Sequence, residues 1–146
     1  MSCPTLLLYT TLDISIAEIE TYLCVRFSLK ENPAGIQSSI GPIRISIEEK
    51  PMKYAMPAEL GERDWTLALM FDCTYHWSEM RILLALKISH HFHLRGGYSF
   101  AWYDTGSPVF ACDENHGLML SEKDQEYFAR YPSPFPSHSF CRLPLI

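Results

Sequence analysis

Cys73 stands where a catalytic nucleophile could stand. It ends an apolar run, Thr66–Cys73, and precedes a segment with helical spacing, with His76 three residues on. A thiol at a helix N-terminus can have a lowered pKa and act as a nucleophile. His116 is the residue that could complete such an arrangement. Free cysteine is more often a buried small hydrophobe, and that is the interpretation we favour for Cys73.

The four residues Asp104-Thr105-Gly106-Ser107 offer a second possible chemistry. They resemble the active-site turn of the aspartic proteases, in which two aspartates share one proton and activate water. The resemblance implies that a chain with one copy would work as a homodimer, as retroviral-type proteases do. That family also needs a flap hairpin and a second apolar strand ending in glycine, and the residues after Gly106 predict neither. We favour a simple hairpin turn, for which these residue types are well suited.

Three histidines, His90, His91 and His93, lie at the end of a predicted helix. His90 and His93 could offer two metal ligands, but a catalytic zinc site needs a third, for which His116 is the candidate. Histidine near a helix C-terminus is also favoured by the helix dipole and the exposed carbonyls. We therefore expect no metal and no other cofactor.

Composition limits the classes of partner. The chain has 146 residues, 47% of them hydrophobic and 20% charged, which is typical of one globular domain. Its net charge of −5 disfavours nucleic acid and anionic membranes and suits a basic protein partner. The five cysteines are widely spaced and predict reduced thiols rather than a disulfide framework. With no signal-peptide pattern and no long apolar run, we expect a cytoplasmic protein without a membrane span.

Hydrophobic periodicity predicts five strands and three helices. The predicted strands cover residues 5–10, 43–48, 66–73, 98–103 and 109–112. The first helix begins at Ser15, whose spacing to Glu18 is that of a capping box. The second helix runs from about His76 to Leu94, and a third follows a cap at Ser121 or Asp124.

These elements predict an α+β fold in one domain, with a mostly antiparallel sheet and the order β-α-β-β-α-β-β-α. The first six elements match the ferredoxin-like split β-α-β pattern, to which a hairpin strand and a C-terminal helix are added. We expect the first two helices on one face of the sheet. The domain should cover residues 1–131, and a proline-rich tail over 132–146 should pack on it. The prolines at 132, 134 and 136 favour an extended polyproline conformation within this tail.

The second helix lies within a block over residues 65–112 that holds all three tryptophans and that we predict to be buried. The helix is apolar on two sides. One predicted core face combines Trp77, Met80, Leu84, Ile88 and Phe92. The second face combines Ile82, Leu83 and Leu86. Such a helix is either sandwiched within its domain or covers a partner. A structural or adaptor subunit that docks through this second face, or through the proline tail, is therefore one functional alternative.

Apart from these motifs, the chain is a small acidic α+β domain without a convincing active site. In size, charge and lack of an active site it resembles the immunity proteins that bacteria pair with secreted antibacterial toxins. The resemblance implies an inhibitor that is not an enzyme and that occludes the basic active site of a toxin or enzyme partner. The protease-like homodimer using Asp104 is the other alternative, and a homo-oligomer is compatible with each hypothesis. The expected partner-binding residues are acidic or aromatic: Glu48, Glu49, Tyr54, Glu59, Glu62, Asp64, Trp65, Asp113 and Glu114.

Overall fold

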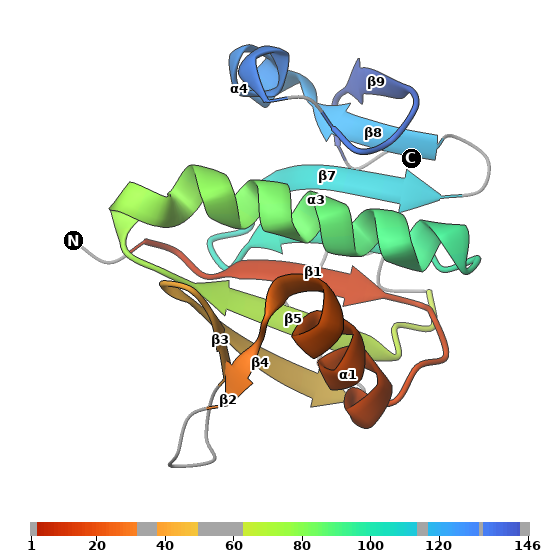
Figure 1. Ribbon diagram of the computed structural model, residues 1–146. Coiled ribbons are helices and arrows are strands. Elements are labelled where there is room, and N and C mark those ends of the chain that lie inside the picture. The colour runs from red at the N-terminus through yellow and green to blue at the C-terminus, as the bar shows by residue number, and fades with distance from the viewer. Residues whose placement is uncertain (1–2, 32–37, 50–62, 114–116, 132, 144–146) are drawn as a thin grey trace.

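Strand β1 (Leu6–Thr10) lies at the centre of the fold, between two antiparallel neighbours. The computed structural model describes residues 3–31, 38–49, 63–113, 117–131 and 133–143. The strands of these residues form one nine-stranded sheet in the order β2-β3-β4-β5-β1-β6-β7-β8-β9 (Figure 1). Every neighbouring pair is antiparallel except β8 and β9, which are parallel.

The remaining strands differ widely in length. They are β2 (Lys30–Glu31), β3 (Ser38–Ile40), β4 (Ile43–Glu49), β5 (Leu67–Asp72), β6 (Ser99–Tyr103), β7 (Pro108–Asp113), β8 (Gly117–Ser121) and β9 (His138–Cys141). The helices are α1 (Ile16–Phe27), α3 (Ser78–Leu94) and α4 (Gln125–Arg130). Short 3-10 turns precede two of them, η1 (Tyr75–Trp77) before α3 and η2 (Glu122–Asp124) before α4.

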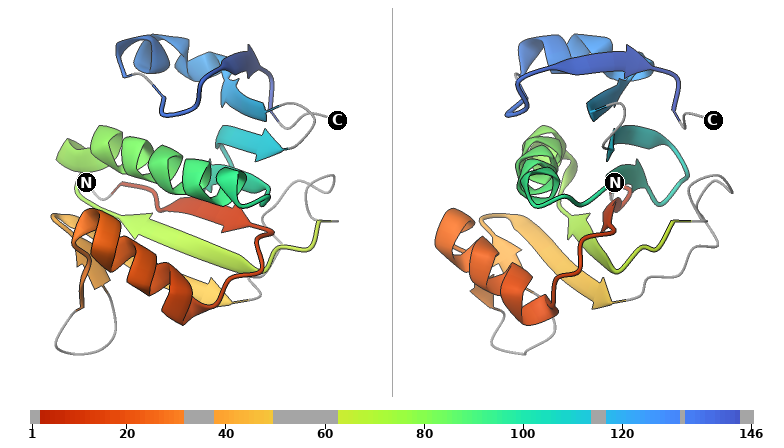
Figure 2. Two further views of the ribbon diagram at one scale, coloured as in Figure 1. Left: turned by 45° about the vertical axis from the view of Figure 1, so that its right-hand side comes forward. Right: turned by 90° about the vertical axis from the view of Figure 1, so that its right-hand side faces the viewer.

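The predicted fold class is confirmed. The adjacent strands β4-β5-β1-β6 have the order of the split β-α-β pattern. Helices α1 and α3, which connect them, cover the same face of the sheet (Figure 2). Strand β7 is the predicted hairpin partner, and α4 is the predicted additional helix.

The predicted capping box also fixes where α1 begins. The Ser15 hydroxyl accepts a hydrogen bond from the Glu18 backbone N–H at 3.1 Å, and the Glu18 carboxylate accepts one from the Ser15 backbone N–H. Ile19 and Leu23 on the apolar face of α1 are buried, as their spacing predicts.

Alternation along the strands produces a core on each face of the sheet. Leu6 and Leu8 of β1 pack under the helices, whereas Tyr9 points to the opposite face. There Tyr9 and Trp102 have ring centroids 4.3 Å apart, and Trp102 and Phe100 lie 5.0 Å apart. Phe100 and Trp102, which alternate along β6, are therefore core residues, as expected.

Two residues assigned to the core of the second helix are not there. Trp77 is 40% exposed and Met80 is 50% exposed. Trp77 belongs to η1, which has three residues per turn, so the 3.6-residue period of α3 cannot be extended back to it. Met80 lies in the first turn of α3, and the buried residues of this helix begin only at Arg81. The helical block is therefore buried over most of its length but not at its start.

The C-terminal region contains a strand that was not predicted. Residues 138–141, after the prolines, form strand β9 within the sheet. Strands β2, β3 and β8 were not predicted either. Within the described part of the chain, neither Ser121 nor Asp124 forms the side-chain cap hydrogen bond that their types suggested.

Candidate functional site

One end of the sheet collects the segments that carry the predicted partner-binding residues. Thr10, the last residue of β1, is opposite Leu67 of β5 and Ser99 of β6. Leu67 in turn is opposite Glu49, the last residue of β4, and Ser99 is opposite Cys112 near the end of β7. The end of β4, the segment before β5 and the end of β7 therefore meet at this end, which we call the carboxylate end (right side of Figure 1).

The structure divides the described candidates into two groups. Glu48, Glu49 and Asp64 are exposed at the carboxylate end. Trp65 is 3% exposed and Asp113 is buried, so neither side chain is presented to solvent as a partner-binding surface requires. The other candidates, Tyr54, Glu59, Glu62 and Glu114, lie outside the described residues.

Arg63 joins the segment before β5 to the neighbouring strands. Its guanidinium lies 3.7 Å from the Asp113 carboxylate and 4.3 Å from the centre of the Tyr98 ring. Two residues further on, Trp65 packs edge-to-face on Tyr9, with ring centroids 6.1 Å apart. Both contacts hold the segment that carries exposed Asp64 against the strands of the sheet.

Close backbone approach holds the same end together on its helical side. A Cβ at Gly97 would lie 2.8 Å from the Leu12 Cβ, so only glycine fits between α3 and β6. The Thr10 hydroxyl donates a hydrogen bond to the Tyr98 carbonyl at 2.9 Å. These contacts place the start of α1 beside the end of α3, where Arg95 and Glu18 form an exposed ion pair at 3.8 Å.

The nucleophile hypothesis for Cys73 loses its chemical basis. Burial is the main influence on this thiol, and it raises the pKa of Cys73 instead of lowering it. The thiol is therefore protonated at neutral pH, as the buried-hydrophobe interpretation expects.

The Asp104-Thr105-Gly106-Ser107 segment forms the hairpin turn between β6 and β7. The Gly106 backbone N–H donates to the Tyr103 carbonyl at 2.8 Å, and Gly106 has a φ of 102°, which glycine adopts without strain. The Asp104 backbone N–H donates to the Thr5 carbonyl, and its side chain is exposed. Hairpin formation accounts for the glycine of the protease-like motif.

The histidines of α3 are packed side chains. His91 stacks on Tyr22 of α1, with ring centroids 3.7 Å apart and planes at 8°. His90 and His93 contact the ring of Phe135, and His93 Nδ1 lies 3.3 Å from Cys112 Sγ. No group of three metal-ligating side chains occurs among the described residues, and His116 lies outside them.

The second apolar face of α3 is mostly covered by the protein itself. Ile82 and Leu86 are buried in the core between helix and sheet, and Leu83 is half-buried. Two of the three side chains that the adaptor hypothesis assigned to docking are therefore inaccessible to a partner. Apolar side chains are exposed instead at the start of the helix, where Tyr75, Trp77 and Met80 lie.

Arg81 is a structurally distinctive residue that the sequence did not single out. Its side chain is 1% exposed, and Nη1 donates to the Pro4 carbonyl at 2.7 Å and to the Phe71 carbonyl at 3.1 Å. The guanidinium also lies 5.5 Å from the centre of the Tyr103 ring. It ties α3 to the end of the sheet where β1 begins, opposite the carboxylate end. The position of Arg81 between Met80 and Ile82 was the one sequence feature that could have drawn attention to it. Helical periodicity alone does not predict that such a charged residue is buried.

Comparison of the chain with protein-family models, curated proteins and solved structures gave no match. Among the described residues, no helix is both long enough and apolar enough to cross a membrane.

Proposed function

We propose that this protein is a protein-binding domain of the inhibitor or immunity type, which occludes a basic site on a toxin or enzyme partner with its carboxylate end. The observation that carries the proposal is the strand register, which gathers Glu48, Glu49 and Asp64 at one end of a rigid sheet. Their exposure leaves them accessible to a partner.

The surroundings of these carboxylates support a role in binding. Arg63 and Arg95 are each engaged with an acidic side chain, Asp113 and Glu18 respectively. These two positive charges are therefore partly neutralised within the protein. Glu48 and Glu49, at the end of β4, are exposed to solvent. A negative surface of this kind speeds association with a positive cleft and sets orientation more than it adds affinity.

Occlusion does not require catalytic groups, which agrees with the chemistry of the chain. The Cys73 thiol is held protonated, and the Asp104 turn is explained by its hairpin. The partner class is a protein whose active site is lined with lysine or arginine, such as a nuclease. The net charge of −5 gives the whole domain the complementary sign.

The test is affinity capture from the source cells followed by native mass spectrometry of the complex. The expected result is a stoichiometric complex with one basic protein whose activity is lost on binding, and whose association slows as salt is added. The Glu48→Lys/Glu49→Lys variant should associate at least about tenfold more slowly.

A matched control carries the same change of charge at the opposite end of the sheet. Glu122→Lys/Glu126→Lys alters two exposed carboxylates beside α4 and should bind like the wild type. If both double variants slow association equally, only net charge matters and the carboxylate end is not the binding site. Absence of any stoichiometric partner would contradict the proposed function as a whole.

A further inference from the structure

The two edges of the sheet are protected to different degrees. Strand β2 at one edge is two residues long and exposes Lys30, a charge that discourages pairing with another chain. Strand β9 at the other edge contains His-Ser-Phe-Cys, with no lysine, acidic residue or proline. Among the described residues, no strand lies on the outer side of β9. Its backbone therefore presents unpaired donors and acceptors along an uncharged edge.

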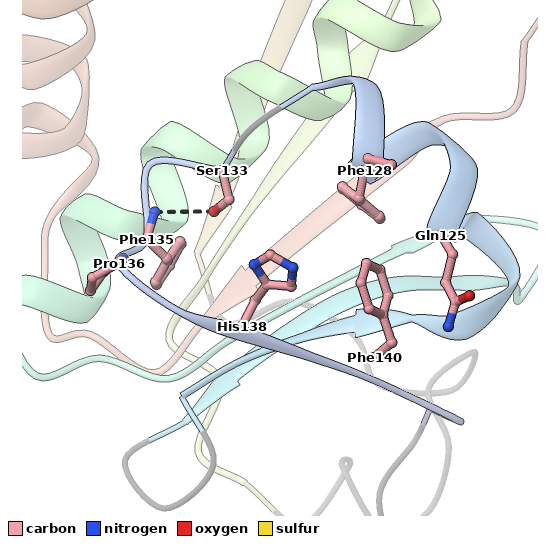
Figure 3. Close-up of a pocket in the computed structure, with 8 residues that line it drawn as sticks. Gln125, Phe128, Ser133, Phe135, Pro136, His138 and Phe140 are labelled. Atoms are coloured by element: carbon pink, nitrogen blue, oxygen red, sulfur yellow. Dashed lines mark hydrogen bonds between the residues drawn. The ribbon is translucent and has the colours of Figure 1, made fainter.

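An apolar groove lies beside this edge. It runs between α4 and β9, and both His138 and Phe140 point into it from the strand (Figure 3). Phe128 forms part of its other wall and is buried, whereas Phe140 remains 36% exposed. An exposed phenylalanine on an unprotected edge strand is what pairing with a further strand would cover.

We propose that the occupant of this edge is a second copy of the chain, whose β9 pairs antiparallel with β9 of the first and extends the sheet across a two-fold axis. Such an axis must be perpendicular to the sheet, so that residues directly opposite each other share a face. With the axis at Ser139, His138 of each copy lies opposite Phe140 of the other. Two aromatic cross-strand pairs then form on the face of the groove, and no like charges within β9 oppose each other.

This interface goes beyond the proposed function and does not depend on it. It uses the edge of the sheet, whereas the carboxylates lie at an end of the strands, so both copies keep Glu48 and Glu49 exposed. A pair of four-residue strands makes a small interface, so we expect a weak dimer.

The test is the molar mass in solution, measured by analytical ultracentrifugation from about 5 to about 300 μM, a range chosen for a weak interface. The wild type should rise from the 16.8 kDa monomer towards twice that mass. Phe140→Lys should remain monomeric, since it places two charges beside the axis. The matched control is Val25→Lys, which makes the same kind of change at an exposed apolar residue of α1 and should dimerise like the wild type.

Ser139→Lys is the second variant if Phe140→Lys does not fold, because Ser139 is exposed and its replacement leaves the groove intact. The register is tested by Ser139→Cys, which should form a disulfide across the axis in mild oxidant, since opposed strand residues have suitable Cα spacing. Exposed Cys24 on α1 is the internal control and should not cross-link. A wild type that stays monomeric at about 300 μM, or a folded Phe140→Lys or Ser139→Lys variant that dimerises normally, would overturn the proposal.

Discussion

At the end of the sheet where β1 begins, a charged side chain is buried, and at the end where β1 stops, charged side chains are exposed. Arg81 at the first end donates two hydrogen bonds to backbone carbonyls of the protein itself. Glu48, Glu49 and Asp64 at the second end are left to solvent. A charge that is committed internally contributes to folding, whereas an exposed charge costs the fold little and is available for a partner. The two ends should therefore respond very differently to substitution.

The largest effect is expected at the buried charge. Arg81→Ala should lower the free energy of unfolding by about 3 kcal/mol, because it removes two hydrogen bonds made by a buried side chain and opens a cavity. Urea unfolding followed by circular dichroism measures this. Lys87→Ala, an exposed change on the same helix, should remain within about 0.5 kcal/mol of the wild type. A loss below about 1 kcal/mol for Arg81→Ala would mean that this end is not held by its charge.

An intermediate effect is expected at the buried carboxylate of the other end. Asp113→Asn removes the charge that faces Arg63 and should cost about 1 kcal/mol. The neighbouring exposed change Asp64→Asn should cost less than about 0.5 kcal/mol in the same unfolding experiment. An equal loss of unfolding free energy in both variants would mean that the buried and the exposed carboxylates of the carboxylate end do not differ in their contribution to folding.

A smaller, pH-dependent effect is expected from His91. Burial chiefly, together with the positive charges of Arg95 and His90, lowers the pKa of His91 from its usual 6.5. The unfolded chain then binds the proton more tightly than the folded one, so stability falls as pH drops below 6.5. His91→Phe keeps a ring against Tyr22 and removes the titration, so its unfolding free energy should depend less on pH between 7 and 5. An unchanged dependence would show that His91 does not contribute to it.

The smallest effect on folding is expected for the exposed pair. Glu48→Lys/Glu49→Lys should change the free energy of unfolding by no more than about 0.5 kcal/mol in total, while it reverses the charge of the proposed binding surface. Thermal unfolding of the unbound protein checks this. If the variant unfolds, these carboxylates are structural and the contrast between the two ends disappears.

Periodicity was sufficient for the core of the fold. Alternating isoleucines predicted β4, and the continuous apolar run before Cys73 predicted β5 as an interior strand. The order of these elements along the chain then predicted the order of the four central strands. The same alternation places Glu48 on the solvent-exposed face of β4, and Glu49 is exposed because it ends the strand.

The outer strands could not be predicted in this way because they carry too little local signal. Strands β2 and β3 have two and three residues, and β9 lies in a stretch that proline dominates. Strand β8 contains the apolar run Leu118-Met119-Leu120, a signal that was present but is too short to separate from a loop. Pairing with neighbours distant in sequence decides these strands, and a local pattern does not contain that information.

The burial of Trp65 and Asp113 is a tertiary effect as well. Trp65 begins the block that the sequence predicts to be buried, and Asp113 directly follows that block, but each also has an acidic residue as its neighbour. In the folded chain Trp65 covers Tyr9 and Asp113 meets Arg63, contacts between residues about fifty positions apart. Local composition therefore identified the segments of the carboxylate end but not which of their side chains are exposed.

The central place of β1 also has a consequence for how the protein is made. Its two pairing partners are β5 (residues 67–72) and β6 (residues 99–103), which are synthesised much later than β1. The apolar segment Leu6–Thr10 therefore leaves the ribosome long before either neighbour exists, and loop closure over such distances is slow. During synthesis this segment is an unpaired, aggregation-prone strand, and nascent chains that end before β6 are expected to need a holding chaperone.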